Sequence, residues 1–145
     1  RFDDLRDQLQ TLYLEKQRSL DTVASNCTFN NNGAAAGTWM GVCDGGVANG
    51  SGVGVIKQAD GSSVEYYGYA TSGVPNGPGY MIVHDSSGSH AIEGNFIAGQ
   101  AEGAMRVSKA GKPDQMRNYS GGQDVGSAGK NAVVTSPFDT LRTGT

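Results

Sequence analysis

Several features are scarce or missing in this chain, and each absence argues against a class of protein. No run of 18 apolar residues occurs, so the sequence holds no candidate transmembrane helix, and no signal peptide is visible. The net charge is −3, which argues against general nucleic-acid binding because such binding needs a clustered basic surface. The chain begins with Arg1 rather than Met, so we expect a processed form or a fragment that has lost upstream targeting information.

Catalytic and metal-binding motifs are also missing. There is no Gly-x-Ser-x-Gly elbow, and the glycine motifs lie between predicted strands rather than before a helix, unlike a phosphate loop. The two histidines, His84 and His90, flank a predicted hairpin turn. The catalytic arrangement that we consider is a relay of His84-Asp85 and His90 with the surrounding serines, but serines are common in any such turn. Two cysteines with distant histidines do not have zinc-site spacing. The sequence therefore predicts no enzyme, no cofactor and no metal.

Cysteine is limited to Cys27 and Cys43, with 15 residues between them. In an oxidising compartment a bridge would tie the end of the N-terminal segment to the first repeat, whereas in the cytosol both would be small buried thiols. Few lysines, many Ser, Gly and Asn residues and an even cysteine count favour the bridge. They favour an extracytoplasmic location, periplasmic or secreted, over a cytoplasmic one.

Glycine is absent from residues 1–32, yet 22 of the 23 glycines lie between Gly33 and Gly129. They recur at fixed offsets in four copies of one motif, which begin 27, 26 and 23 residues apart: Gly46–Gly52, Gly73–Gly79, Gly99–Met105 and Gly122–Ala128. Such a period predicts a repeat array, with glycines where the backbone needs positive φ or close approach. The repeat-structural glycines are Gly46, Gly50, Gly52, Gly73, Gly77, Gly79, Gly99 and Gly103.

Each repeat is predicted to be a short strand, a glycine-rich bend, a second strand and a turn. Asp60-Gly61 joins the β-rich runs 53–58 and 62–69, and Asp-Gly between such runs is a strong hairpin signal. The pattern resembles the MORN repeat, whose consensus is Tyr-x-Gly-x-Trp/Phe-x-x-Gly-x-x-x-Gly-x-Gly. The resemblance implies a mainly β fold, an elongated single-layer antiparallel sheet of repeated hairpins over residues 39–129, and a surface that holds partners or self-assembles.

The first and second aromatic positions of this consensus vary along the array. The first is occupied in turn by Trp39, Tyr66, Ile92 and Gln115, and the second by Cys43, Ala70, Phe96 and Tyr119. Repeats 1 and 2 have glycine at every glycine position of the consensus, whereas repeat 3 has Met105 at the last of them. Repeat 4 departs far enough from the consensus to be a capping unit, which open arrays need.

The ends of the chain fall outside the repeats. Residues 1–25 predict a helix, because Phe2, Leu5, Leu9 and Leu12 have heptad spacing, and this helix is either the end of a longer coiled coil or is packed on the sheet. Residues 26–38 predict a polar linker. Residues 130–145 predict a tail, or a short capping helix over Pro137–Arg142.

Strand alternation predicts which side chains share a face. Trp39, Tyr66, Ile92, Phe96 and Tyr119 should share one face, and Met40, Val42, Tyr67, Tyr69, Glu93, Ile97 and Met116 the other. Tyr67, Tyr69, Met40 and Ile97 are the predicted partner-binding residues, unless Tyr67 and Tyr69 pack against a terminal segment. We therefore expect a non-enzymatic scaffold that binds a protein partner or itself and no nucleic acid.

An alternative is an envelope-associated module that binds anionic lipid or glycan. Its basic element would be Arg106, Lys109, Lys112 and Arg117, in a stretch, residues 105–130, whose net charge is +3. Residues 33–104 instead carry a net charge of −5, which weakens this alternative.

Overall fold

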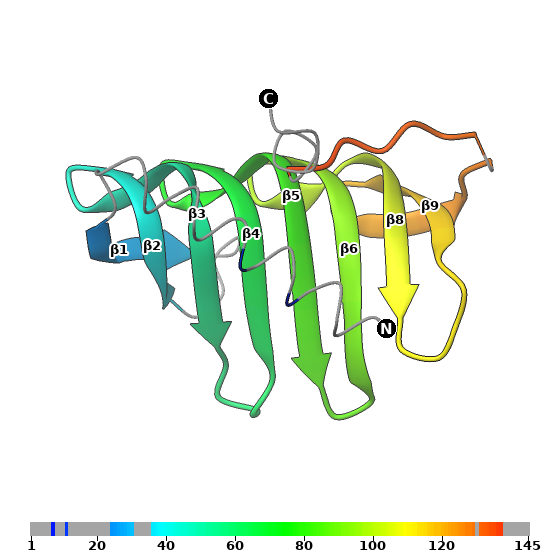
Figure 1. Cartoon of the computed structure of the whole chain (residues 1–145), viewed down its shortest axis with the longest axis horizontal. Helices are drawn as coiled ribbons and strands as arrows, with labels where there is room; N and C mark the ends of the chain where they lie inside the picture. Colours follow the sequence, from blue (N-terminus) through cyan, green and yellow to red (C-terminus); the bar gives the residue numbers. More distant parts are fainter. Residues whose placement is uncertain (1–6, 8–10, 12–23, 31–35, 130, 138–145) are drawn as a thin grey trace.

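The computed structural model describes residues 7, 11, 24–30, 36–129 and 131–137, in which ten strands form one sheet (Figure 1). Neighbouring strands pair antiparallel, β7 and β8 both pair with β6, and one parallel contact links β1 to β3. The strands are β1 (Ala24–Asn30), β2 (Ala36–Asp44), β3 (Val47–Lys57), β4 (Ser63–Thr71), β5 (Val74–Asp85), β6 (Gly88–Ile97), β7 (Gln100–Ala101), β8 (Gly103–Lys109), β9 (Gln115–Ser120) and β10 (Gln123–Ser127). The prediction of a mainly β fold of consecutive hairpins is confirmed.

Strand β1 corrects two boundaries drawn from the sequence. The predicted linker over residues 26–38 instead contains most of β1 and the start of β2, and the helix over residues 1–25 cannot reach its predicted end, because Ala24 already belongs to β1. The reason is a period-two pattern among polar neighbours: Cys27 and Phe29 are buried, whereas Thr28 between them is exposed. The rest of the predicted N-terminal helix, apart from Asp7 and Thr11, and the C-terminal helix beyond Pro137 lie outside the described residues.

Four two-residue turns account for the period of the glycine motif. They are Gly45-Gly46, Ser72-Gly73, Ala98-Gly99 and Gly121-Gly122, and both residues of each have positive φ. This is the type I′ turn, whose twist matches that of antiparallel strands. The first glycine of every motif copy is thus the second residue of a hairpin turn.

The last glycine of the motif makes room for an aromatic ring. A Cβ at Gly79 would lie 2.5 Å from Cε1 of Tyr66, and a Cβ at Gly52 would lie 2.5 Å from Cζ2 of Trp39. In repeat 3, where the first aromatic position holds Ile92, Met105 replaces this glycine and its own side chain is fully buried. The departure from the consensus is therefore compensated within the repeat.

Each of the last three turns is hydrogen-bonded to the repeat before it. The second turn residue donates its N–H to a backbone carbonyl of the preceding repeat in three cases, which are Gly73 to Ala48, Gly99 to Pro75 and Gly122 to Ala101. The first turn residue donates to a side chain: Ser72 to Asn49, Ala98 to Asn76 and Gly121 to Glu102. We call Asn49, Asn76 and Glu102 the turn acceptors; they link neighbouring repeats, so the glycine motif has a structural role.

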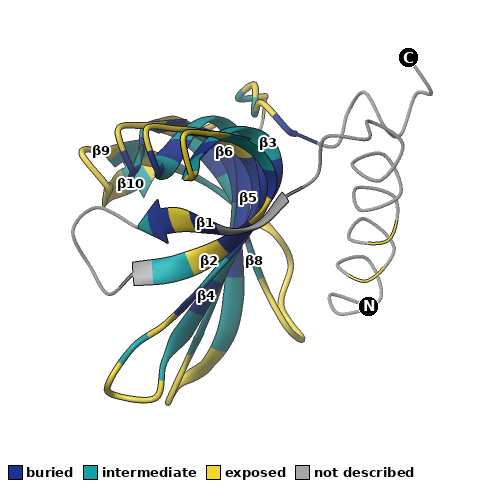
Figure 2. Ribbon diagram, turned by 90° about the vertical axis from the view of Figure 1, so that its left-hand side faces the viewer, coloured by how far each residue is buried: buried dark blue, intermediate teal, exposed yellow. Residues whose placement is uncertain are grey.

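The sheet curls around β1, and we call the face toward β1 the inner face (Figure 2). Its core consists of Cys27, Phe29, Trp39, Ala48, Ile56, Val64, Tyr66, Ala70, Met81, Phe96, Ala101 and Met105, with Ile92 and Tyr119 packed against it. The ring of Phe29 stacks on those of Trp39 and Tyr66, with centroids 5.1 and 5.7 Å apart, and Phe96 meets Tyr66 edge-on at 5.6 Å. The predicted face of Trp39, Tyr66, Ile92, Phe96 and Tyr119 is confirmed.

The predicted disulfide is present and joins β1 to β2 through Cys27 and Cys43. Two backbone bonds also hold β1 across the first two repeats, from Thr28 N–H to the Gly46 carbonyl and from Asn30 N–H to the Gly73 carbonyl. Such bridges are typical of proteins from oxidising, extracytoplasmic compartments.

The outer face is also largely covered at its centre. Val53, Tyr67, Tyr80, Ile82, Ala91 and Glu93 point to this side and each is no more than 7% exposed. Tyr67 and Tyr80 are in ring contact, 6.2 Å between centroids. The surface open to partners on this face therefore lies around that centre.

Candidate functional site

The four residues predicted to bind a partner have different surroundings. Met40, Tyr69 and Ile97 are exposed, at 43%, 44% and 52% of their full area, whereas Tyr67 is 1% exposed. The Tyr67 hydroxyl donates to Oε1 of Glu65 at 2.6 Å. Tyr67 therefore belongs to the covered centre of the outer face, and Met40, Tyr69 and Ile97 remain as candidate contact residues.

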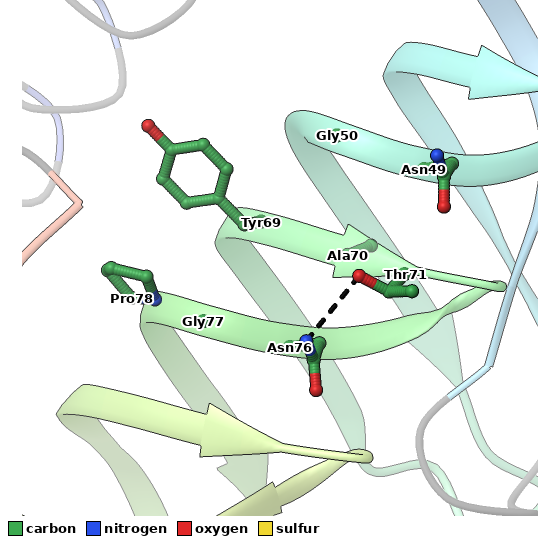
Figure 3. A pocket seen from close by; sticks show the side chains of 8 residues that line it. All are labelled: Asn49, Gly50, Tyr69, Ala70, Thr71, Asn76, Gly77 and Pro78. Atoms are coloured by element: carbon green, nitrogen blue, oxygen red, sulfur yellow. Dashed lines mark hydrogen bonds between the residues drawn. The ribbon is translucent and has the colours of Figure 1, made fainter.

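A shallow hollow of about 480 Å³ lies beside Tyr69, where repeats 1 and 2 meet (Figure 3). The side chain of Tyr69 points away from the sheet, and Pro78 projects from the neighbouring strand on the same side. The hollow is lined by Asn49, Gly50, Tyr69, Ala70, Thr71, Asn76, Gly77 and Pro78. An exposed aromatic ring with polar groups at its rim has the composition of an interaction surface.

The relay of His84 and Asp85 considered from the sequence is not formed; His84 belongs to a different network. Nδ1 of His84 lies 2.6 Å from Oγ of Ser89, and Nε2 lies 2.8 Å from Oε2 of Glu65. Asp85 instead accepts hydrogen bonds from the backbone and hydroxyl of Ser87, which hold the pKa of Asp85 below its ordinary value. His84 and Ser89 are directly paired across β5 and β6, and His84 and Ser63 across β5 and β4, so the network spans three strands.

This network contains a serine, a histidine and a carboxylate in contact, but its members are also cross-strand neighbours on one face of the hairpin. Cross-strand polar pairs of this kind stabilise a sheet without any catalytic role. Sequence reasoning missed the network, although one signal was present: His84 and Ser89 are equally distant from the turn between Asp85 and Gly88.

The predicted basic element is divided by ion pairs. Arg106, on the outer face, lies 2.7 Å from the buried carboxylate of Glu93, and Arg117 makes a two-pronged contact with Asp124 at 3.0 Å. The side-chain bonds with Asp124 raise the pKa of Arg117. Among the described residues no ion-pair partner is found for Lys109 or Lys112, so the free cations of this end are these two lysines.

A polar cavity of about 550 Å³ lies at the C-terminal end of the inner face. It is lined by Ser87, Gly88, Ser89, His90, Val107, Lys109, Ala110, Lys112, Gln115, Arg117, Tyr119 and Asp124. The strand residues alternate toward the inner face, on β8 Val107 and Lys109 and on β9 Gln115, Arg117 and Tyr119. Three of the four predicted basic residues, Lys109, Lys112 and Arg117, line this cavity, but the sequence did not predict the cavity itself.

Two titratable side chains of the cavity are held in their neutral forms at physiological pH. Burial lowers the pKa of His90, with the nearby charge of Lys109 adding to this, while Asp85 opposes it. Burial and the charge of Asp124 raise the pKa of Tyr119. Both are therefore uncharged hydrogen-bonding groups.

No cluster of three or more His, Cys, Asp or Glu side chains suited to a metal ion is found in the described part of the chain. Within the same residues, no helix combines the length and apolar character needed to cross a membrane. Protein-family models and curated proteins were both compared with the chain, and none matches it.

Proposed function

We propose that the chain is a MORN-like repeat protein that acts as a non-enzymatic interaction module, binding a protein partner or a second copy of itself. The observation that carries the proposal is Tyr69, which is 44% exposed and borders the hollow between repeats 1 and 2. Met40, in the middle of β2, and Ile97, at the end of β6, add exposed apolar area to the same face. Aromatic residues and methionine are enriched where proteins meet.

The repeat construction supports this proposal. The turns of repeats 2, 3 and 4 are each bonded to the preceding repeat, and a disulfide holds β1 against the array, so the surface belongs to a rigid scaffold. A pre-organised surface loses less conformational entropy on binding than a loose one does. The bridge also supports a periplasmic or secreted location for the module.

A site-specific photocrosslinker in place of Tyr69 tests the proposal in the full chain. We expect crosslinks to one defined protein or to a second copy of the chain. The same probe in place of Lys57, an exposed residue at the opposite end of the hairpin, is the control and should give none. Sedimentation over a range of concentrations then distinguishes self-association from binding of another protein. Tyr69→Ser should weaken either complex, whereas Tyr69→Phe should preserve it. Absence of a position-specific crosslink, together with a monomer at all concentrations, would reject the proposal.

A further inference from the structure

The cavity at the C-terminal end of the inner face is separate from the Tyr69 surface and has a different chemistry. Its walls come from two hairpin ends, Ser87–His90 and Lys109–Gln115, and from β9 and β10. A volume of about 550 Å³ lies within the range of small-molecule sites.

Two cations face this space without a carboxylate partner among the described residues. Lys109 is the last residue of β8, and Lys112 lies in the loop that follows. The N–H of Lys112 donates a hydrogen bond to the carbonyl of Lys109 at 3.1 Å. The nearby Arg117 is held by two contacts to Asp124, whose Oδ1 also accepts the N–H of Gly126. The lysines can therefore bind an anionic group while the Arg117–Asp124 pair stays fixed as a wall.

The remaining polar groups are uncharged donors and acceptors. His90, Gln115 and Tyr119 line the cavity, and burial keeps the first and last of these neutral. Side chains that can donate and accept hydrogen bonds, together with the half-buried ring of Tyr119, suit a molecule with several hydroxyl groups. A bare inorganic anion would contact the lysines but leave this wall unused.

We propose that this cavity binds a small polyhydroxylated anion, of the class of sugar acids and sugar phosphates, with the anionic group between Lys109 and Lys112 and the hydroxyl groups against His90, Gln115 and the Arg117–Asp124 pair. The acidic repeats 1 and 2 disfavour anions elsewhere on the array, so the ligand is directed to this end. A free saccharide and the headgroup of a glycolipid present the same chemistry, and the experiment below distinguishes the two sources.

Calorimetric titration of the full chain with galacturonic acid, glucose 6-phosphate, glucose and inorganic phosphate tests the proposal. We expect both charged sugars to bind, and glucose and phosphate to bind at least about tenfold more weakly, since each lacks one set of contacts. Lys109→Gln with Lys112→Gln should weaken the charged sugars by about tenfold or more. The matched control is Lys57→Gln, which removes a lysine from a different hairpin end and should change nothing. High salt should weaken binding in the unmodified chain.

The outcomes are separable. Phosphate binding as tightly as the charged sugars, or no measurable binding of any probe, would overturn the proposal. Flotation with vesicles that contain an acidic glycolipid, without binding of the free sugars, would also overturn it and assign the lysines to a membrane surface. Circular dichroism checks that the lysine variants fold, and Tyr69→Ser should bind the sugars normally, so failure of the interaction surface and failure of the cavity are distinguishable.

Discussion

In repeats 1 and 2 the inner face is filled by a strand from outside the array, whereas in repeats 3 and 4 the repeats fill it themselves. The second aromatic position holds Cys43 and Ala70 in the first half, and β1 supplies Cys27 and Phe29 there. In the second half the same position holds Phe96 and Tyr119, and no strand of the described chain lies over it.

The difference shows that an apparent loss of consensus can mark a docking place. A small residue in an aromatic position would leave a void, which costs stability unless another group fills it. Around Tyr119, at the ends of β8 and β9, inner-face positions become polar and the face opens into a cavity. The same curl thus encloses a core at one end and a binding space at the other.

Truncation of Phe29 should have the largest effect. Phe29 is fully buried in contact with the rings of Trp39 and Tyr66, so Phe29→Ala should lower the free energy of unfolding by about 3–5 kcal/mol. Tyr119→Ala, at a half-buried position of the second half, should cost clearly less. Urea denaturation of both variants measures the difference, and equal costs would refute the view that β1 is the core of the first half.

Reduction of the disulfide should have the second largest effect and lower the free energy of unfolding by about 3 kcal/mol for a loop of this length. Amide hydrogen exchange should then speed up at Thr28 and Asn30, whose N–H groups bond the turn carbonyls, before it does so at Ala98. The double variant Cys27→Ser, Cys43→Ser is the control, because reductant should leave its exchange unchanged. Uniform loss of protection along the array would contradict a local role for the bridge.

Restoring a large residue in the first half should depend on β1. Ala70→Phe in the native chain should overpack the inner face and cost about 1–3 kcal/mol. In the Phe29→Ala background the new ring has room, so the same substitution should cost less or stabilise. The two effects form a double-mutant cycle by denaturation. Additive energies would show that Ala70 and Phe29 do not share one space.

Removal of a turn acceptor should have a modest effect. Asn76→Ala removes the 2.9 Å bond from Ala98 N–H and should cost about 0.5–1.5 kcal/mol. Val125→Ala alters the equivalent position of repeat 4, where the residue is 63% exposed, and should stay within about 0.5 kcal/mol. If both variants unfold alike, the side-chain bond does not couple the repeats.

The smallest effect concerns the exposed pair in the second half. The side-chain bond with Arg117 holds the pKa of Asp124 below its ordinary value. A lowered carboxylate pKa adds stability that is present above the unfolded-state pKa and is lost as pH falls through the folded-state pKa. The free energy of unfolding should therefore be larger for the native chain than for Asp124→Asn at neutral pH. Denaturation should show that this difference disappears in acid and becomes smaller in high salt. A difference that is constant with pH would exclude this pair as its cause.

The sequence predicted the parts of the fold that depend on local chemistry. Turn-forming Asp60-Gly61 and the period of Gly46, Gly73 and Gly99 are readable because a turn is decided by the few residues that form it. Alternation along single strands also sorted Trp39 and Tyr66 onto one face. These predictions needed no knowledge of how distant segments meet.

The features that were missed depend on segments that meet after folding. Strand β1 has two apolar side chains, Cys27 and Phe29, among polar residues, and it is held by the Cys43 sulfur and by the turn carbonyls of the first two repeats, which the sequence alone does not bring together. The network of Glu65, His84 and Ser89 needs the register of three strands, and the burial of Tyr67 needs knowledge of what covers its face. The cavity likewise exists only once the sheet has curled.

The turn acceptors give the array a direction and an end. Each acceptor binds the turn of the repeat that follows it, so the side-chain link between repeats runs in one direction along the array. Glu102 still does so, but the equivalent residue of repeat 4 is Val125, which cannot accept a hydrogen bond. The series of turn acceptors therefore ends at repeat 3, and Val125→Asn would give repeat 4 a side-chain oxygen at this position.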